Sequence, residues 1–161
     1  MLPNHIYYAI LALCCGYATF KGGGPERIGA TIFIVASVLS SAVVSNRPVR
    51  FGSLEAGVFA VDFAVLLALL PLALRAERFW PLWALALHLI ATAAHTVKLV
   101  DPWVIPQAYA FVLALWSYPM LLLLVFGTWN HQRRLARFGV DRSWSSFSGR
   151  SEPRPPTGPI G

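Results

Sequence analysis

The chain has few charged side chains for its length. Of its 161 residues, 12% are charged and 57% are hydrophobic, and the mean hydropathy is +0.60. An ordinary soluble domain carries about 25% charged residues. The apolar residues also fall in long blocks that are separated by short charged connections. This arrangement argues against a soluble core and is typical of a polytopic α-helical membrane protein.

Catalytic and metal-binding motifs are missing. The sequence contains no GxSxG or HExxH, and the glycine-rich segment "KGGGPER" lacks the GK[ST] ending of a phosphate-binding loop. The two cysteines, Cys14 and Cys15, are adjacent, so their side chains point about 100° apart on a helix and form neither a CxxC pair nor a zinc half-site. We therefore predict no catalytic residue and no metal site, and the sequence favours a protein that is not an enzyme.

The first apolar segment lacks the features of a cleaved leader. No Lys or Arg precedes it in "MLPNH", no A-x-A-like site follows it, and its flanking charge, Lys21, lies on the wrong side. We expect this segment to be retained as a membrane span.

Five apolar blocks have helix signals at their ends. Pro3 and Ser53 suit helix starts, and "KGGGP", "NRP" and "DP" suit helix ends. Each block has roughly 17 to 25 residues, which is enough to cross a hydrocarbon core of about 30 Å. The sequence therefore predicts an all-α, five-helix transmembrane bundle, with spans at about 3–20, 28–45, 54–74, 79–99 and 104–128.

Positive charge differs between the two sides of this predicted bundle. Five spans place the first and third connections and the C-terminal tail on one side, and that side holds most of the 13 Lys and Arg residues. Because cytoplasmic loops are enriched in Lys and Arg, we predict an N-out, C-in, multi-pass protein. Arg outnumbers Lys by eleven to two, which suggests a GC-rich bacterial genome and therefore a bacterial inner membrane. The residues on the predicted cytoplasmic side are Lys21, Arg27, Arg75, Arg78, Arg133, Arg134, Arg137, Arg142, Arg150 and Arg154, against Arg47, Arg50 and Lys98 on or near the other.

The composition changes after the last predicted span. Residues 1–129 form the predicted transmembrane domain, and residues 130–161 form a basic cytoplasmic tail. Within the tail, "HQRRLARF" suits a short interfacial helix, and the remainder is rich in Ser, Pro, Gly and Arg and is expected to be largely disordered. Because the arginines lie at span ends and in the tail, we expect the lipid bilayer, and not nucleic acid, as the partner.

Small residues recur every fourth position on the second and third spans. Such stripes let membrane helices approach closely, so we expect the two spans to pack together with their stripes facing each other. The stripes are Ser37, Ser41 and Ser45 on the second span and Ala56, Ala60, Ala64 and Ala68 on the third.

The third and fourth spans carry ionisable side chains. Asp62 lies on the third span, and His88 and His95 lie seven residues apart on one face of the fourth. If the hairpin turns near Glu77, facing residue numbers sum to about 154, and Asp62 lies opposite Thr92 between the two histidines. An ionised Asp at mid-bilayer costs roughly 2.5–3.5 kcal/mol, so Asp62 is predicted to face the bundle interior and pair with a histidine.

The same register brings other charged residues together near the outer surface. Glu55 falls close to Lys98 and Asp101, and these three are the predicted outer-side ion pairs. Lys98 is also close enough to the interface to reach water along its own stem.

Three functions are open at this stage. The first is a small accessory or scaffold-type membrane protein, associating with itself or with a larger complex, in which the Asp62, His88, His95 and Thr92 cluster joins helices. The second is a proton- or ion-coupled transporter or channel subunit that uses the same cluster, since buried Asp and His chains are usual relay components.

The third function is binding of haem b. One helix cannot supply both axial ligands, so His5 on the first span would have to pair with His95 on the fourth. No other cofactor is expected, and the acidic and histidine spacing matches no metal signature that would support a lipid-modifying enzyme.

Overall fold

The computed structural model describes the backbone of residues 4–45, 51–100 and 106–145, and side chains over 5–43, 57–94 and 116–145. The described chain is helical, with no strand in these ranges apart from one isolated bridge between Ala76 and Trp144. The helices are α1 (Asn4–Lys21), α2 (Gly24–Ser45), α3 (Phe51–Arg75), α4 (Trp80–Val100) and α5 (Pro106–Phe138).

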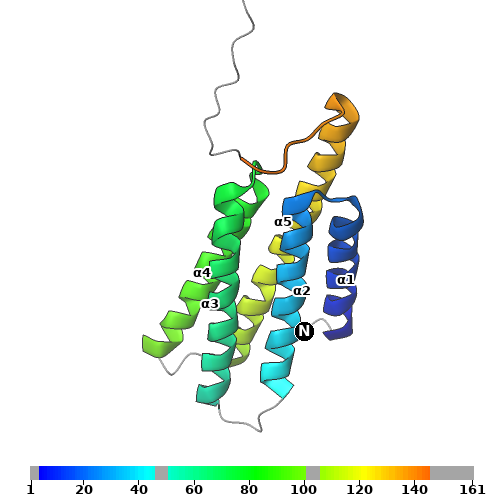
Figure 1. The fold of residues 1–161 in the computed structure, drawn as a ribbon. Helices are drawn as coiled ribbons and strands as arrows, with labels where there is room; N and C mark the ends of the chain where they lie inside the picture. The colour runs from blue at the N-terminus through cyan, green and yellow to red at the C-terminus, as the bar shows by residue number, and fades with distance from the viewer. Residues whose placement is uncertain (1–3, 46–50, 101–105, 146–161) are drawn as a thin grey trace, which may run out of the picture.

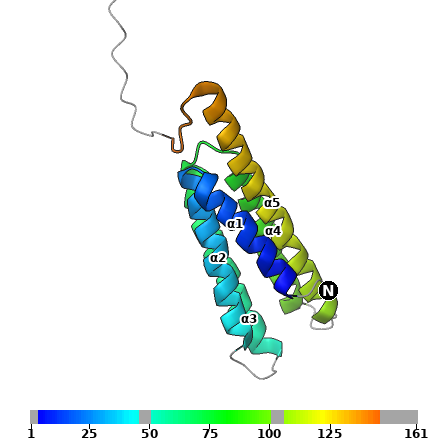
Figure 2. The ribbon, with the colours of Figure 1, turned by 90° about the vertical axis from the view of Figure 1, so that its right-hand side faces the viewer.

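The five helices form a closed ring. Each packs against the next in the sequence, α5 returns to pack against α1, and α2 and α5 also touch across the middle. Figures 1 and 2 show the helices running nearly parallel, with α5 projecting beyond the others at one end. The α1–α2 turn, the α3–α4 turn and the segment after α5 all lie at this end, which we call the polar end.

Two helix boundaries differ from the sequence prediction. Helix α2 begins at Gly24 and not near residue 28, and α5 continues well past Thr128 to Phe138. The segment "HQRRLARF" is therefore the last part of α5 and not a separate interfacial helix. The helix stops at Gly139, whose φ of 71° and N–H bond to the Leu135 carbonyl (2.9 Å) make a left-handed C-terminal cap.

The side chain of Trp80 is the largest element of the core at the polar end. It is 3% exposed and lies between glycines of two other helices. A Cβ at Gly29 of α2 would come within 2.4 Å of the Trp80 ring, and a Cβ at Gly127 of α5 within 2.3 Å. Only glycine leaves room for this indole. Around it the core is apolar and drawn from all five helices, including Leu11, Cys15, Phe33, Leu69, Ala84, Leu121 and Leu124.

The outer surface of the bundle is also apolar. Two helical stretches, Gly24–Val43 in α2 and Gly57–Arg75 in α3, are long and apolar enough to span a membrane, and Trp80–Ala94 is a shorter apolar stretch. Only 28% of the α2 stretch and 22% of the α3 stretch are buried inside the protein. Large apolar side chains therefore point outward, among them Leu13, Val38, Leu67, Trp83, Leu122 and Phe126.

The predicted pairing of the two small-residue stripes holds for the alanines only. Ala64 and Ala68 of α3 lie at the interface with α2, as expected. Ser41 instead contacts the Tyr8 hydroxyl of α1 at 2.5 Å and donates to the Ser37 carbonyl at 2.7 Å. Ser41 therefore faces α1, where the Tyr8 phenol is a hydrogen-bond partner that the α3 alanines do not offer.

Candidate functional site

The predicted α3–α4 cluster contains a hydrogen bond, but to the main chain. The Nε2 atom of His88 lies 2.8 Å from the carbonyl oxygen of Asp62, and since a carbonyl only accepts, His88 is the donor. The His88 ring is 7% exposed. The buried Thr92 hydroxyl donates to the His88 carbonyl of its own helix at 2.8 Å. His88 therefore joins α4 to the main chain of α3.

The predicted register places His88 one turn from the position opposite Asp62. His88, and not Thr92, reaches the main chain at Asp62. Helical carbonyls point toward the C-terminus of their helix, and α3 runs toward the end at which α4 begins. The Asp62 oxygen is therefore displaced toward the first half of α4, where His88 lies.

The other predicted residues are largely outside the described side chains. His95 and Lys98 of α4 and Glu55 of α3 lie within helices, but their side chains are not among those described, and Asp101 lies outside the described residues. His5 is exposed at the start of α1. The proposed haem pair and the outer-side ion pairs thus remain predictions.

A second polar grouping lies at the polar end, and it begins with Glu26. This residue occupies the third position of α2, and its Oε2 accepts the N–H of Gly23 at 3.0 Å, in the manner of a capping box. Its Oε1 accepts the indole N–H of Trp80 at 3.0 Å and lies 3.3 Å from Nε of Arg78. Glu26 is fully buried. One carboxylate thus caps α2 and ties it to the start of α4.

Arg78 connects this carboxylate to the segment after α5. Its Nη1 donates to Oδ2 of Asp141 at 2.5 Å, and its side chain is 1% exposed. The left-handed turn at Gly139 reverses the chain, which brings Asp141 back to the α3–α4 turn (Figure 1). Arg78 therefore lies between two carboxylates from distant parts of the sequence.

Two residues of α5 complete the group. Nδ1 of His131 lies 2.6 Å from Oδ2 of Asp141, and Nε of Arg134 lies 3.2 Å from Oδ1. Because an ionised carboxylate only accepts, the short contact assigns the hydrogen to Nδ1, and the 3.1 Å approach of Arg78 Nη2 to the same nitrogen is then a packing contact. We call Glu26, Arg78, His131, Arg134 and Asp141 the ion-pair network.

The charges within the network balance. Two carboxylates face two guanidinium groups, and Nε of both Arg78 and Arg134 lies within ion-pair distance without hydrogen-bond alignment. Burial alone would raise the pKa of Asp141, but the hydrogen bonds from His131 and Arg78 and the charges of Arg78 and Arg134 outweigh it and lower that pKa. Asp141 is therefore held as an anion.

The chain just beyond Asp141 is attached to the end of α3. The N–H and hydroxyl of Ser145 both donate to the Arg75 carbonyl, at 2.9 and 3.0 Å, and Trp144 pairs with Ala76. A carbonyl at the C-terminus of a helix has no partner within its helix, and Ser145 provides one for the carbonyl of Arg75. We call residues 142–145 the C-terminal strap. Residues 139–145, which sequence analysis places in a largely disordered tail, are part of the packed structure.

The sequence contains one signal for this network that motif analysis overlooked. In "GGGPER" a glycine precedes the helix and a glutamate follows three residues later, which is the spacing of a capping box and marks a helix start. The partners Arg78, His131 and Asp141 are far apart in the chain and follow no pattern. Reading the arginines only as orientation signals also hid Arg78, which is buried.

The arrangement binds helix ends together. Within the described side chains, no group of three or more His, Cys, Asp or Glu residues is placed to hold a metal ion. No protein-family model, curated protein or solved structure matches the chain.

Proposed function

We propose that this chain is a small polytopic membrane protein of the accessory or scaffold type, with all five helices crossing the bilayer. The observation that carries the proposal is the distribution of its side chains. Apolar groups cover the outside of the bundle, while the buried charges gather at one end. A soluble helical protein buries its most apolar stretches, whereas less than a third of each apolar stretch in α2 and α3 is buried.

The polar end suits the cytoplasmic face of the membrane. It carries exposed Lys21, Arg27, Arg75 and Arg137 in addition to the network. Positive charge at short connections marks the cytoplasmic side, so the proposed topology is N-out, C-in, in a bacterial inner membrane. The projecting end of α5 and the strap would then lie at the lipid headgroups and in the cytoplasm.

The scaffold assignment rests on how the polar groups are used. The His88 bond joins α4 to α3, and the network joins the starts of α2 and α4 to the end of α5. Each donor and acceptor in these bonds serves contact between helices. A rigid bundle with an apolar exterior is suited to self-association or to packing against a larger membrane complex.

Topology mapping tests the membrane proposal. With the full chain expressed in a bacterial host, the protein should stay in the membrane pellet after an alkaline carbonate wash. A C-terminal fluorescent protein should fluoresce, and alkaline phosphatase inserted after Asn46 should be active, because that connection is predicted to lie outside. Release by carbonate, or phosphatase activity at the C-terminus, would contradict the proposal.

Proton flux separates the scaffold from the transporter. In liposomes with an imposed pH gradient, the reconstituted chain should dissipate the gradient no faster than empty liposomes. A flux that is present in the wild type and lost in Asp62→Asn would instead establish the transport alternative. Normal size-exclusion elution of both proteins is the control for folding.

A further inference from the structure

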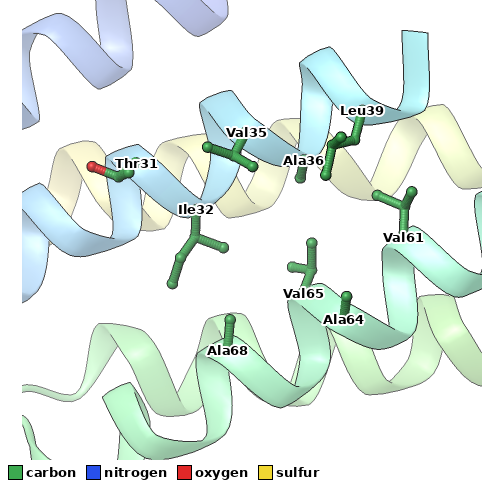
Figure 3. A pocket seen from close by; sticks show the side chains of 9 residues that line it. All are labelled: Thr31, Ile32, Val35, Ala36, Leu39, Val61, Ala64, Val65 and Ala68. Carbon is green, nitrogen blue, oxygen red and sulfur yellow. The ribbon is translucent and has the colours of Figure 1, made fainter. Parts of the chain in front are cut away.

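A shallow apolar groove runs along the outside of the bundle between α2 and α3. Its volume is about 210 Å³. Figure 3 shows side chains from both helices lining it, with Thr31 and Ala68 near one end and Leu39 and Val61 near the other. Alanines on both helices make room for it: Ala36 on α2, and Ala64 and Ala68 on α3.

The groove lies along the middle of α2 and α3. From Thr31 to Leu39 the helix rises about 12 Å, and Arg27 lies one turn, about 6 Å, closer to the polar end. With Arg27 at the headgroups, the groove would begin about 6 Å and end about 18 Å into a core that is about 30 Å thick. The groove thus ends close to the midplane of the bilayer.

Two exposed arginines extend the groove's walls toward the polar end. Arg27 lies four residues before Thr31, whose hydroxyl donates to the Arg27 carbonyl at 2.9 Å. Arg75 lies seven residues after Ala68, which returns α3 to nearly the same face. Both arginines are exposed, and so is Glu77, which leaves a net positive charge at this end.

Trp144 of the C-terminal strap also lies at this end. A Cβ on Gly24, two turns before Thr31, would meet the Trp144 ring at 3.1 Å, and Trp144 pairs with Ala76 beside Arg75. The ring is 42% exposed. An amphipathic indole at this level is typical of the headgroup region.

The charge beside the groove decides its occupant. The apolar lining alone suits an acyl chain and a ridge of helix side chains equally well. Basic groups beside a gap between membrane helices on the cytoplasmic side suit anionic headgroups. We propose that the groove binds one acyl chain of an anionic phospholipid from the cytoplasmic leaflet, with its phosphate between Arg27 and Arg75. This inference rests on the proposed membrane topology.

Native mass spectrometry of the full chain tests the proposal, with phosphatidylglycerol and phosphatidylcholine of identical acyl chains as probes. The wild type should retain one phosphatidylglycerol in preference to phosphatidylcholine. The double variant Arg27→Gln/Arg75→Gln should lose that preference, by about fivefold in affinity per arginine. Ala64→Leu, which fills the groove, should weaken retention of both lipids.

Two control variants make the test specific. Arg137→Gln removes an exposed charge at the end of α5, and Leu67→Phe adds bulk at an exposed position of α3, so both should retain lipid like the wild type. If Arg137→Gln lost the preference for phosphatidylglycerol as the double variant does, the lipid would be held by general attraction to surface charge, and the proposal would be overturned. The proposal would also be overturned if Arg27→Gln/Arg75→Gln retained lipid like the wild type. The same holds if Ala64→Leu changed the oligomeric mass but not the retention of lipid. If the proposed membrane topology is wrong, the carbonate wash releases the protein from the membrane. That result is independent of the lipid measurements, so the two failures are distinguishable.

Discussion

The polar end and the middle of the α3–α4 interface both contain buried polar groups, but they join helices in different ways. At the polar end, Arg78 lies between the carboxylates of Glu26 and Asp141, all almost fully buried. In the middle, His88 donates a hydrogen bond to a main-chain oxygen. The first arrangement depends on charge balance, and the second on a bond to the main chain.

This difference determines what removal of a partner costs. Loss of one member of a buried ion pair leaves a charge without compensation, which is far more costly than the net value of the pair. Loss of an interhelical hydrogen bond in a membrane protein costs little on average, because other partners replace it. The polar end is therefore expected to control stability, although the middle of the interface is the more conspicuous in the sequence.

The largest effect is expected for Arg78→Met. The change leaves the buried Glu26 and Asp141 without their shared cation, and should lower the free energy of unfolding by about 3–5 kcal/mol. The measurement is unfolding in detergent micelles. Adding Glu26→Gln should recover part of the loss, while Arg137→Met, at an exposed site, should change little. A loss as small as that of Arg137→Met would show that the network is not stabilising.

The next effect is expected for Asp141→Asn, with a loss of about 1.5–3 kcal/mol near neutral pH. The lowered pKa of Asp141 stabilises the fold above the ordinary Asp value of about 3.9, and this contribution disappears as pH falls through the folded-state pKa. The difference between wild type and variant should therefore shrink on acidification. Unfolding curves at a series of pH values measure this, with exposed Glu77→Gln as the control. A constant difference would contradict the assigned role.

A packing change at the polar end comes third. Gly127→Ala places a methyl group against the Trp80 ring and should destabilise the protein by about 1–3 kcal/mol. Gly16→Ala is the matched control, because a Cβ at Gly16 meets nothing within 4 Å. Thermal unfolding of both variants measures the effect. Equal midpoints for the two would show that the indole moves aside easily.

The smallest effect is expected in the middle of the bundle. His88→Leu removes one bond to the Asp62 carbonyl and should cost about 0.6 kcal/mol. Asp62→Asn preserves that carbonyl and therefore the bond. Detergent unfolding of both variants checks this. A loss in His88→Leu that equals that of Arg78→Met would remove the distinction between the two regions.

The sequence by itself determined the helical class and most helix positions, because apolar blocks and Pro- and Gly-rich turns act locally. The count of five apolar blocks also predicted that the first and third connections and the tail share one end. It misplaced the end of α5, since nothing in "HQRRLARF" stops a helix before Gly139.

Only the tertiary structure decided which polar groups meet. His88 contacts the main chain at Asp62 because carbonyl direction and helix register are set by packing. Trp80 is buried because Gly29 and Gly127 of separate helices leave space for its ring. Arg78 meets Glu26 and Asp141 because three chain segments converge at one end of the bundle. Such contacts depend on distances between residues far apart in the chain, which no local pattern records.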